Sequence, residues 1–141
     1  MTDPNDNSCE LCDSAGGELL WRGPLCRIVL VDDPAYPGFC RVILDRHVKE
    51  MTDLAPAERA QLMEAVFATE AALRSLLRPD KINLASLGNV TPHLHWHVIA
   101  RYRDDRHFPA PVWAAPAREN APPRERPGRD ALMRILKQHL G

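Results

Sequence analysis

The sequence predicts an α+β fold, with an antiparallel sheet, one long helix and a short C-terminal helix. Apolar, strand-like runs lie both before and after a single long amphipathic segment, and this order favours an antiparallel sheet over alternating βαβ units. Histidines also occur at every second position from 93 to 97, a spacing that makes sense on a strand. The 141 residues amount to one ordinary domain, and 45% hydrophobic residues suffice for a core.

The first strands are expected early in the chain. Residues 1–8 are polar and acidic and are expected to be disordered, and a folded domain is expected to span residues 9–113. Glu18 to Trp21 could form a short strand. Cys26 to Val31 and Phe39 to Leu44 are rich in β-branched and apolar residues, which is typical of strands, and the Pro- and Gly-containing segment between them predicts a loop.

One long helix is expected in the middle of the chain. Pro56 suits its first turn, where the missing N–H costs nothing. Pro79 disfavours helical geometry in the residue before it, so the helix should end near Arg78. Apolar residues at spacings of three and four form a stripe that suits packing on a sheet. These residues are Leu62, Ala65, Val66, Leu73, Leu76 and Leu77.

A strand from Lys81 to Leu87 and a turn should lead into a histidine-bearing strand from Leu94 to Tyr102. Alternate side chains of a strand face opposite sides. One face would therefore carry three imidazoles and the other an apolar set that packs on the core. The imidazoles belong to His93, His95 and His97, and the apolar side chains to Leu94, Trp96 and Val98.

Residues 114–141 are expected to form a Pro/Ala-rich tail with a short helix. The stretch from Pro109 to Pro127 contains six prolines, counting both ends, so it can neither pair in a sheet nor continue a helix. Asp130 to Leu140 carries apolar residues at helical spacing and predicts a short amphipathic helix. Trp113 suggests that the tail docks rather than acting as a free linker.

Composition excludes several function classes. A formal net charge of −1 argues against a broadly basic nucleic-acid surface, and no apolar run approaches the ~20 residues of a membrane span. The N-terminus lacks a signal-peptide pattern, so the expected compartment is the cytoplasm. In that reducing environment the four cysteines should be thiols or metal ligands. Cys26 and Cys40, in apolar runs, are expected to be buried.

The three histidines admit three interpretations. The strand could simply have a His-rich exposed face. Two or three imidazoles could hold zinc with an open position for water. One imidazole could instead attack an electrophile such as phosphorus, while its neighbours set its tautomer and handle protons.

The segment His93-Leu94-His95-Trp96-His97-Val98-Ile99 resembles the motif that names the histidine triad (HIT) family of nucleotide hydrolases and transferases. The resemblance extends from Cys9 to about Trp113 and includes the order of strands and long helix. The segment from Val42 to His47 and the turn from Pro34 to Gly38 also fall in the family's order. It implies a HIT-like antiparallel sheet with one long helix.

The resemblance implies a phosphohistidine mechanism. His95 would attack the α-phosphorus of a nucleotide, and water would then release the nucleoside monophosphate. His97 would bond phosphate oxygens and the scissile bridge, and as an imidazolium it would stabilise charge in the transition state. The implied substrates are dinucleoside polyphosphates or nucleoside phosphoramidates.

Three residues are candidates for substrate binding by the same resemblance. Asn89 stands where the family usually has a glutamine beside the phosphates, and Asn83 resembles a polar residue of the same pocket or is ordinary strand polarity. Asp32 is the candidate for the ribose hydroxyls, shifted by a residue against the usual pattern, or is an ordinary loop aspartate. A base pocket, or else core packing, is expected for Leu25, Ile28 and Phe39.

A structural zinc site is expected near the N-terminus. Cys9 and Cys12 have the separation of paired zinc ligands. Some HIT proteins bind zinc with such a pair together with histidines at the positions of His47 and His93, so the resemblance implies a site of these four residues. The alternative is an empty thiol pair, with His93 relaying a proton or hydrogen bond.

Three functions stay open from the sequence: a nucleotide hydrolase or transferase, a zinc-dependent hydrolase with an open metal site among the histidines, and a non-catalytic nucleotide-binding protein. The resemblance implies a homodimer that pairs through the long helix and the adjoining strand. Trp113 would then cap the partner's site or pack on its own domain. No nucleic acid or membrane partner is expected.

Overall fold

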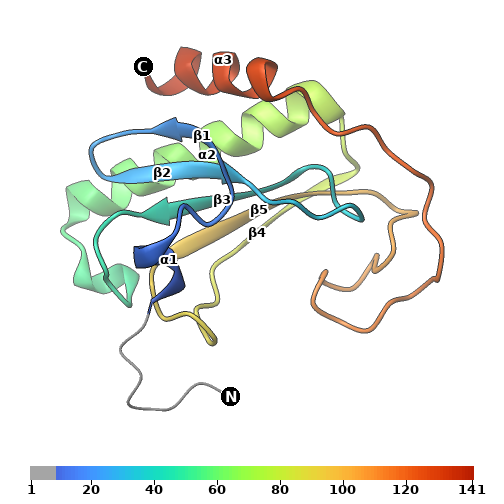
Figure 1. The fold of residues 1–141 in the computed structure, drawn as a ribbon, viewed down its shortest axis with the longest axis horizontal. Helices are drawn as coiled ribbons and strands as arrows, with labels where there is room; N and C mark the ends of the chain where they lie inside the picture. Colours follow the sequence, from blue (N-terminus) through green and yellow to red (C-terminus); the bar gives the residue numbers. More distant parts are fainter. Residues whose placement is uncertain (1–8) are drawn as a thin grey trace.

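A five-stranded antiparallel sheet in the order β1-β2-β3-β5-β4 forms the centre of the protein (Figure 1). The computed structural model describes residues 9–141, so the disorder expected for residues 1–8 lies outside the described residues. The sheet, one long helix and a C-terminal helix confirm the predicted α+β class. Within residues 9–141 no helix combines the length and apolar character that crossing a membrane requires.

Most elements lie where the sequence predicted them. The strands are β1 (Glu18–Arg22), β2 (Cys26–Leu30), β3 (Phe39–Leu44), β4 (Lys81–Ala85) and β5 (His95–Arg101), and the helices are α1 (Glu10–Asp13), the 3-10 turn η1 (Met51–Asp53), α2 (Pro56–Leu77) and α3 (Arg129–Leu140). β4 ends two residues earlier than expected, and β5 starts at His95 rather than Leu94. His93 therefore precedes the strand, in a turn where its N–H donates to the carbonyl of Thr91.

The helix α2 begins and ends for the expected reasons. Pro56 occupies its first turn, and the Glu58 side chain accepts a hydrogen bond from the Ala55 N–H at 3.0 Å. Arg78 caps the C-terminus in the left-handed conformation, directly before Pro79. Leu76, predicted in the buried stripe, is instead exposed, because it lies in the last turn of the helix, one residue before the helix ends at Leu77. The buried residues are Leu62, Ala65, Val66, Ala68, Thr69, Ala72 and Leu73.

The sheet has one face toward α2 and one face that carries the histidines. The face toward α2 forms the main core with side chains from all strands, including Leu94 and Val98, with Trp96 packed against it, as predicted. Leu132 and Leu136 of α3 join the same cluster, so the tail helix docks on the domain. The opposite face, here called the histidine face, is defined by Phe39, Arg41 and Ile43 of β3 and His95, His97 and Ile99 of β5.

Two segments cover the ends of the histidine face. At one end Leu11 and Cys9 of the N-terminal turn pack on Val29 and Ile43. At the other end Phe39 and Ile99 cluster with Tyr36, with Val31 and Val112 packed against them. The central part of the face, with His95, His97 and Arg41, lies between these two covers.

A buried ion pair holds the second cover in place. Arg101 Nε donates to Asp105 Oδ2 at 2.8 Å, and the two side chains are only 2% and 4% exposed. Burial by itself raises the pKa of Asp105, but hydrogen bonds from Arg101 and from the N–H groups of Tyr102, Phe108 and His107 outweigh it and hold the pKa well below its usual range. Arg101 also donates to the carbonyl of Ala110 at 2.8 Å. These bonds fold the chain back onto the sheet after β5.

We expect Asp105→Ala to destabilise the protein by about 3–5 kcal/mol, because it leaves the Arg101 charge buried and unpaired. Asp104→Ala is the matched control, since Asp104 is 54% exposed and its ion pair with Arg124 should contribute about 0–1 kcal/mol. Urea denaturation measures both changes. Equal unfolding free energies for the two variants would contradict the role assigned to the buried pair.

Candidate functional site

His95 opens strand β5 with its tautomer set by the backbone. Its Nδ1 lies 2.6 Å from the carbonyl oxygen of His93. A carbonyl only accepts, so Nδ1 carries the proton and donates, and the hydrogen-bond geometry assigns the lone pair of the neutral ring to Nε2. The ring is therefore arranged for Nε2 to act as a nucleophile.

His97 lies beside His95 in an aromatic setting. The two ring centroids are 4.9 Å apart, and the ring of Trp113 lies 4.9 Å from His97 on the same chain. Phe39 contacts His97 edge-on at 5.6 Å. Trp113 thus packs on its own domain, one of the two placements expected for it.

The charge state of His97 differs from the expected imidazolium. Burial, together with the electrostatic effect of the neighbouring His95 and Arg41, lowers the pKa of His97 to about 4. The ring is therefore neutral near pH 7 when no substrate is bound. Its Nδ1 is buried and has no hydrogen-bond partner within residues 9–141.

His93 belongs to a different cluster from the other two histidines. Its Nδ1 lies 3.3 Å from Cys9 Sγ, 3.4 Å from Cys12 Sγ and 3.2 Å from His47 Nδ1. The prediction that His93 lies on the strand is wrong, because His93 lies in the turn before β5. Its ring contacts Cys9, which covers one end of the histidine face. The four predicted zinc ligands do come together, with all ligand atoms within 4.8 Å of one another.

The donor set of this cluster suits a tetrahedral metal. His93 Nε2 donates to the Leu44 carbonyl at 2.6 Å, which leaves the Nδ1 lone pair for a metal. Burial lowers the pKa of His93, and the neutral ring is the form that ligates. Two thiols and two imidazoles form the closed set of structural zinc sites.

Arg27 positions the cysteine-bearing turn, a role that sequence reasoning missed. Its guanidinium donates to the carbonyls of Leu11 at 2.6 Å, Ser14 at 3.0 Å and Ala15 at 3.1 Å, and to Asp45 at 3.2 Å. Arg27 is 4% exposed. The turn is therefore fixed to β2 by the protein itself.

The other two cysteines behave as predicted. Cys26 and Cys40 are buried and free. Burial raises the pKa of Cys26 to about 11 and that of Cys40 to about 12, so both remain protonated thiols near neutral pH.

The structure does not bring the three predicted substrate-binding residues into contact with His95 or His97 within residues 9–141. Asn83 Oδ1 accepts a hydrogen bond from Arg101 Nη1 at 2.7 Å. Asn89 is exposed in the turn between β4 and β5. The side chain of Asp32 is 93% exposed and lies 3.8 Å from Arg126.

The expected base-pocket residues separate between the two faces. Leu25 and Ile28 belong to the core under α2, so core packing is correct for them. Phe39 lies on the histidine face. Arg41, which was missed, lies on that face too, opposite His97 in the pairing of β3 with β5. The alternation of Phe39, Arg41 and Ile43 along β3 is the signal that could have found it.

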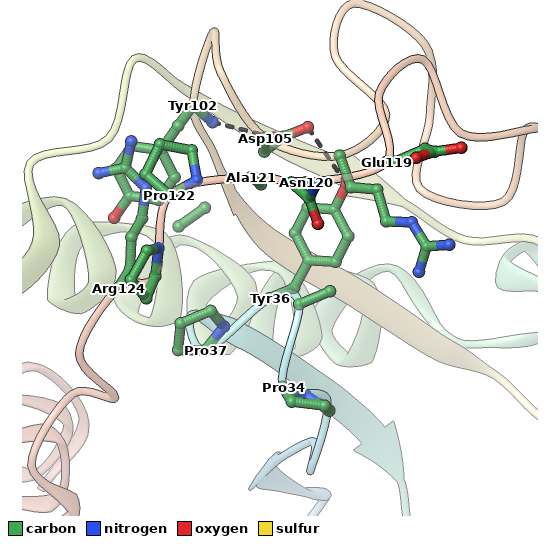
Figure 2. A pocket seen from close by; sticks show the side chains of 14 residues that line it. Pro34, Tyr36, Pro37, Tyr102, Asp105, Glu119, Asn120, Ala121, Pro122 and Arg124 are labelled. Carbon is green, nitrogen blue, oxygen red and sulfur yellow. Dashed lines mark hydrogen bonds between the residues drawn. The ribbon is translucent and has the colours of Figure 1, made fainter.

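Two cavities lie near these elements. One of about 280 Å³ reaches His93 and His95 and is lined by residues 49–52 and 86–88. Another, of about 370 Å³, lies between the loop 34–37 and the tail 119–124, away from the three histidines. Figure 2 shows Tyr36 of this second cavity pointing toward Asp105, to which its hydroxyl donates at 3.2 Å. Only the first cavity adjoins the candidate nucleophile.

Comparisons of sequence find nucleotide enzymes. The model of the HIT domain matches residues 16–104. An "AP-4-A phosphorylase" of Mycobacterium tuberculosis is 32% identical over 98 residues, which cover 65% of this chain and 50% of the relative. A "bis(5'-nucleosyl)-tetraphosphatase [asymmetrical]" of Schizosaccharomyces pombe is 26% identical over 95 residues, 64% of this chain and 52% of the relative. The chain thus spans about half the length of these curated relatives.

Solved structures agree with the fold. A histidine triad protein of Bradyrhizobium japonicum has a TM-score of 0.68 and 28% identity, covering 88% of this chain and 92% of its own. A histidine triad protein of Sinorhizobium meliloti has a TM-score of 0.68 and 29% identity, with coverages of 89% and 91%.

We expect the melting temperature to fall more steeply with decreasing pH in the parent than in His97→Asn. His97 has a pKa of about 4 in the folded protein against an ordinary value of 6.5, so the unfolded state binds a proton first as the pH falls through that window. The stability contributed by the neutral ring is complete above pH 6.5 and is lost toward pH 4.

Thermal melts between about pH 7 and pH 4.5 measure the slope of melting temperature against pH for each protein. All melts contain EDTA, so that metal release is equal. His139→Asn, which alters an exposed histidine, should follow the parent. Parallel slopes for the parent and His97→Asn would show that His97 titrates normally.

Proposed function

Because the chain belongs to the HIT family, we propose that it is a nucleotide hydrolase or transferase that cleaves at an α-phosphate through His95. The single observation that carries the proposal is the hydrogen bond from His95 Nδ1 to the carbonyl of His93 at 2.6 Å, which leaves the Nε2 lone pair for attack. A neutral imidazole needs no base to remove a proton before it attacks, unlike a serine hydroxyl.

The reaction runs in two steps. His95 Nε2 forms a bond to the α-phosphorus while the bond from phosphorus to the bridging oxygen or nitrogen breaks, and the leaving group departs with the electron pair and takes up a proton. Water, or another acceptor in a transferase, then bonds to phosphorus. The N–P electron pair returns to Nε2, and the nucleoside monophosphate or its transfer product is released.

His97 is the second residue of the mechanism. Its unpaired Nδ1 and its position 4.9 Å from the His95 ring suit it to bond the transferred phosphate. Phosphate charge beside the ring favours its protonated form and works against the burial that lowers its pKa. Substrate binding would therefore produce the imidazolium that the transition state needs.

The substrate class we propose is a dinucleoside polyphosphate, with nucleoside phosphoramidates as the other candidate. One curated relative is named an AP-4-A phosphorylase, and another is named an asymmetrical bis(5'-nucleosyl)-tetraphosphatase. The cavity of about 280 Å³ beside His95 offers space for a leaving group. Asn89, in the turn that borders this cavity, would donate to phosphates, while Asn83 and Asp32 remain the proposed contacts of the nucleotide.

A zinc hydrolase with an open site among the histidines is less well supported. His93 turns to the cysteines, and the four-residue cluster includes neither His95 nor His97. A non-catalytic nucleotide-binding protein would have no need for the arranged Nε2 of His95. Both alternatives are decided by the experiments below.

We expect His95→Ala to lower turnover by at least about a thousandfold, because no other group supplies the nucleophile. The measurement mixes protein with a dinucleoside polyphosphate labelled at the α-phosphate, quenches with base, and locates the label by mass spectrometry. The parent and the control His139→Ala should carry label on His95. If His95→Ala turns over as fast as the parent and no label is found, the proposal fails.

We propose that Cys9, Cys12, His47 and His93 hold a structural zinc ion. The support is that their ligand atoms lie within 4.8 Å of one another and that the Nδ1 lone pair of His93 is directed at the cysteines. A bound zinc would crosslink the N-terminal turn to the start of β5, and would supply no chemistry to the substrate. Arg27 and the Leu44 carbonyl preset the ligands for it.

We expect about one zinc per chain in the parent and a loss of zinc in Cys12→Ser, since Cys12 is exposed and its removal spares the core. Cys26→Ala is the control cysteine outside the cluster. Metal content by mass spectrometry and the melting temperature with and without zinc are the readouts. A Cys12→Ser protein that holds as much zinc as the parent would refute the site.

The homodimer is also a proposal. β4 is an edge strand, and Phe67 on α2 is 48% exposed, so both elements expected at the interface present unpaired surface. Trp113 packs on His97 of its own chain, so capping of the site does not require the tail to cross to a partner.

A further inference from the structure

We propose that Arg41 reads the nucleobase of the bound nucleotide and selects a base edge with two adjacent hydrogen-bond acceptors, as in guanine, over adenine. This inference rests on the proposed function, because it takes the α-phosphate to lie at His95. It adds a base preference that the catalytic geometry alone does not give.

Three arginines lie on neighbouring strands of this side of the sheet, and their bonding differs. Arg27 donates to three carbonyls and to Asp45. Arg101 donates to Asp105, Asn83 and Ala110. Arg41 makes one hydrogen bond among residues 9–141, from Nη1 to the Gly16 carbonyl at 3.1 Å, and its buried Nε has no partner there.

Arg27 and Arg101 hold loops in place, whereas Arg41 makes a single hydrogen bond within residues 9–141. Leaving a buried donor unpaired costs free energy, so an apolar residue of similar length would serve the fold better here. A ligand with acceptor atoms would satisfy the free donors. Arg41 is half-buried, and its flexible side chain can rotate to present Nε and Nη2 to that ligand.

The position of the guanidinium favours the base over the phosphate. The Cα of Arg41 is paired with His97 on one side and with Val29 of β2 on the other. Gly16 and Gly17 lie against Ile43 of β3 and Val29 of β2, so the bond to Gly16 holds the guanidinium over β3 and β2 rather than over β5. Strands lie about 4.8 Å apart, so we place the guanidinium about one strand spacing from the His95 ring, where the α-phosphate is proposed to bind.

The leaving group has a separate space on the side of β5 that faces away from β3. The cavity of about 280 Å³ adjoins the β4–β5 turn, and β4 lies on the opposite side of β5 from β3. The nucleoside attached to the transferred phosphate is therefore the part that extends toward Arg41. Phe39, whose ring lies 5.9 Å from Arg41 Cζ, offers a flat apolar neighbour for a base.

The chemistry of the guanidinium selects among bases. Nε–H and Nη2–H point in parallel in one plane, a fork that matches two adjacent acceptors. Guanine presents O6 and N7 side by side, whereas adenine presents N7 beside an amino donor. Adenine would therefore place a donor against a donor. A bidentate contact of this kind corresponds to an affinity for guanine about 5-fold to 150-fold higher than for adenine.

The test measures equilibrium binding of GMP, IMP, AMP and 7-deaza-GMP to the full chain by calorimetry. The parent should bind GMP and IMP, which share O6 and N7, about tenfold or more tightly than AMP. 7-Deaza-GMP, which lacks the N7 acceptor, should lose most of that advantage. Guanosine and adenosine, which have no phosphate, should keep the same order of affinity.

Arg41→Leu should bring GMP and AMP to equal affinity. Arg41→Lys keeps the positive charge but not the fork, so it should also lose the preference while retaining phosphate attraction. Thermal melts verify that both variants are folded, and either one suffices for the comparison.

Two results overturn the inference while the proposed function stands. One is equal binding of GMP and AMP by the parent. The other is an equal loss for both nucleotides in Arg41→Leu, which would mean that Arg41 holds phosphate or stacks on any base. If no nucleotide binds and His95 is never labelled, the proposed function fails and takes this inference with it.

Discussion

The carbonyl and the ring of His93 serve two different neighbours, and this division organises the whole site. The carbonyl accepts from His95 Nδ1 at 2.6 Å and sets the tautomer of the proposed nucleophile. The ring donates from Nε2 to the Leu44 carbonyl and offers Nδ1 to the cysteines. Any disturbance of this turn would act on the Cys/His cluster and on the His95 ring together. The two proposed functions are adjacent but use different atoms of one residue.

Part of this arrangement could be predicted from the sequence. The order of strands and helix, and the alternation from His95 to Val98, follow from local periodicity, which short-range sterics impose. The assembly of Cys9, Cys12, His47 and His93 was expected from resemblance, and the structure brings them together.

Other features depend on contacts that local pattern does not contain. The orientation of His93 arises from a turn and a hydrogen bond to Leu44, a residue far away in the chain. The neutral state of His97 comes from burial under segments distant in sequence, including Trp113. Asp32 lies in the expected loop, yet its 93% exposure could be known only from the packing of that loop. The hydrogen bonds of Arg27 and Arg101 could not be predicted either, because they depend on how the loops that these arginines hold are folded.

The tail also changes what the two edges of the sheet can do. Arg129 donates to the backbone carbonyl of Leu19 on β1, the Trp21 indole donates to the carbonyl of Gly141, and the β1–β2 register shifts between Leu19 and Trp21. An edge strand with an interrupted register and a carbonyl already bonded to the tail is a poorer template for another chain. β4, paired in regular register with β5, is the opposite edge. Strand addition at one edge alone ends after two chains, so covering β1 with the tail would favour a closed pair over open-ended growth.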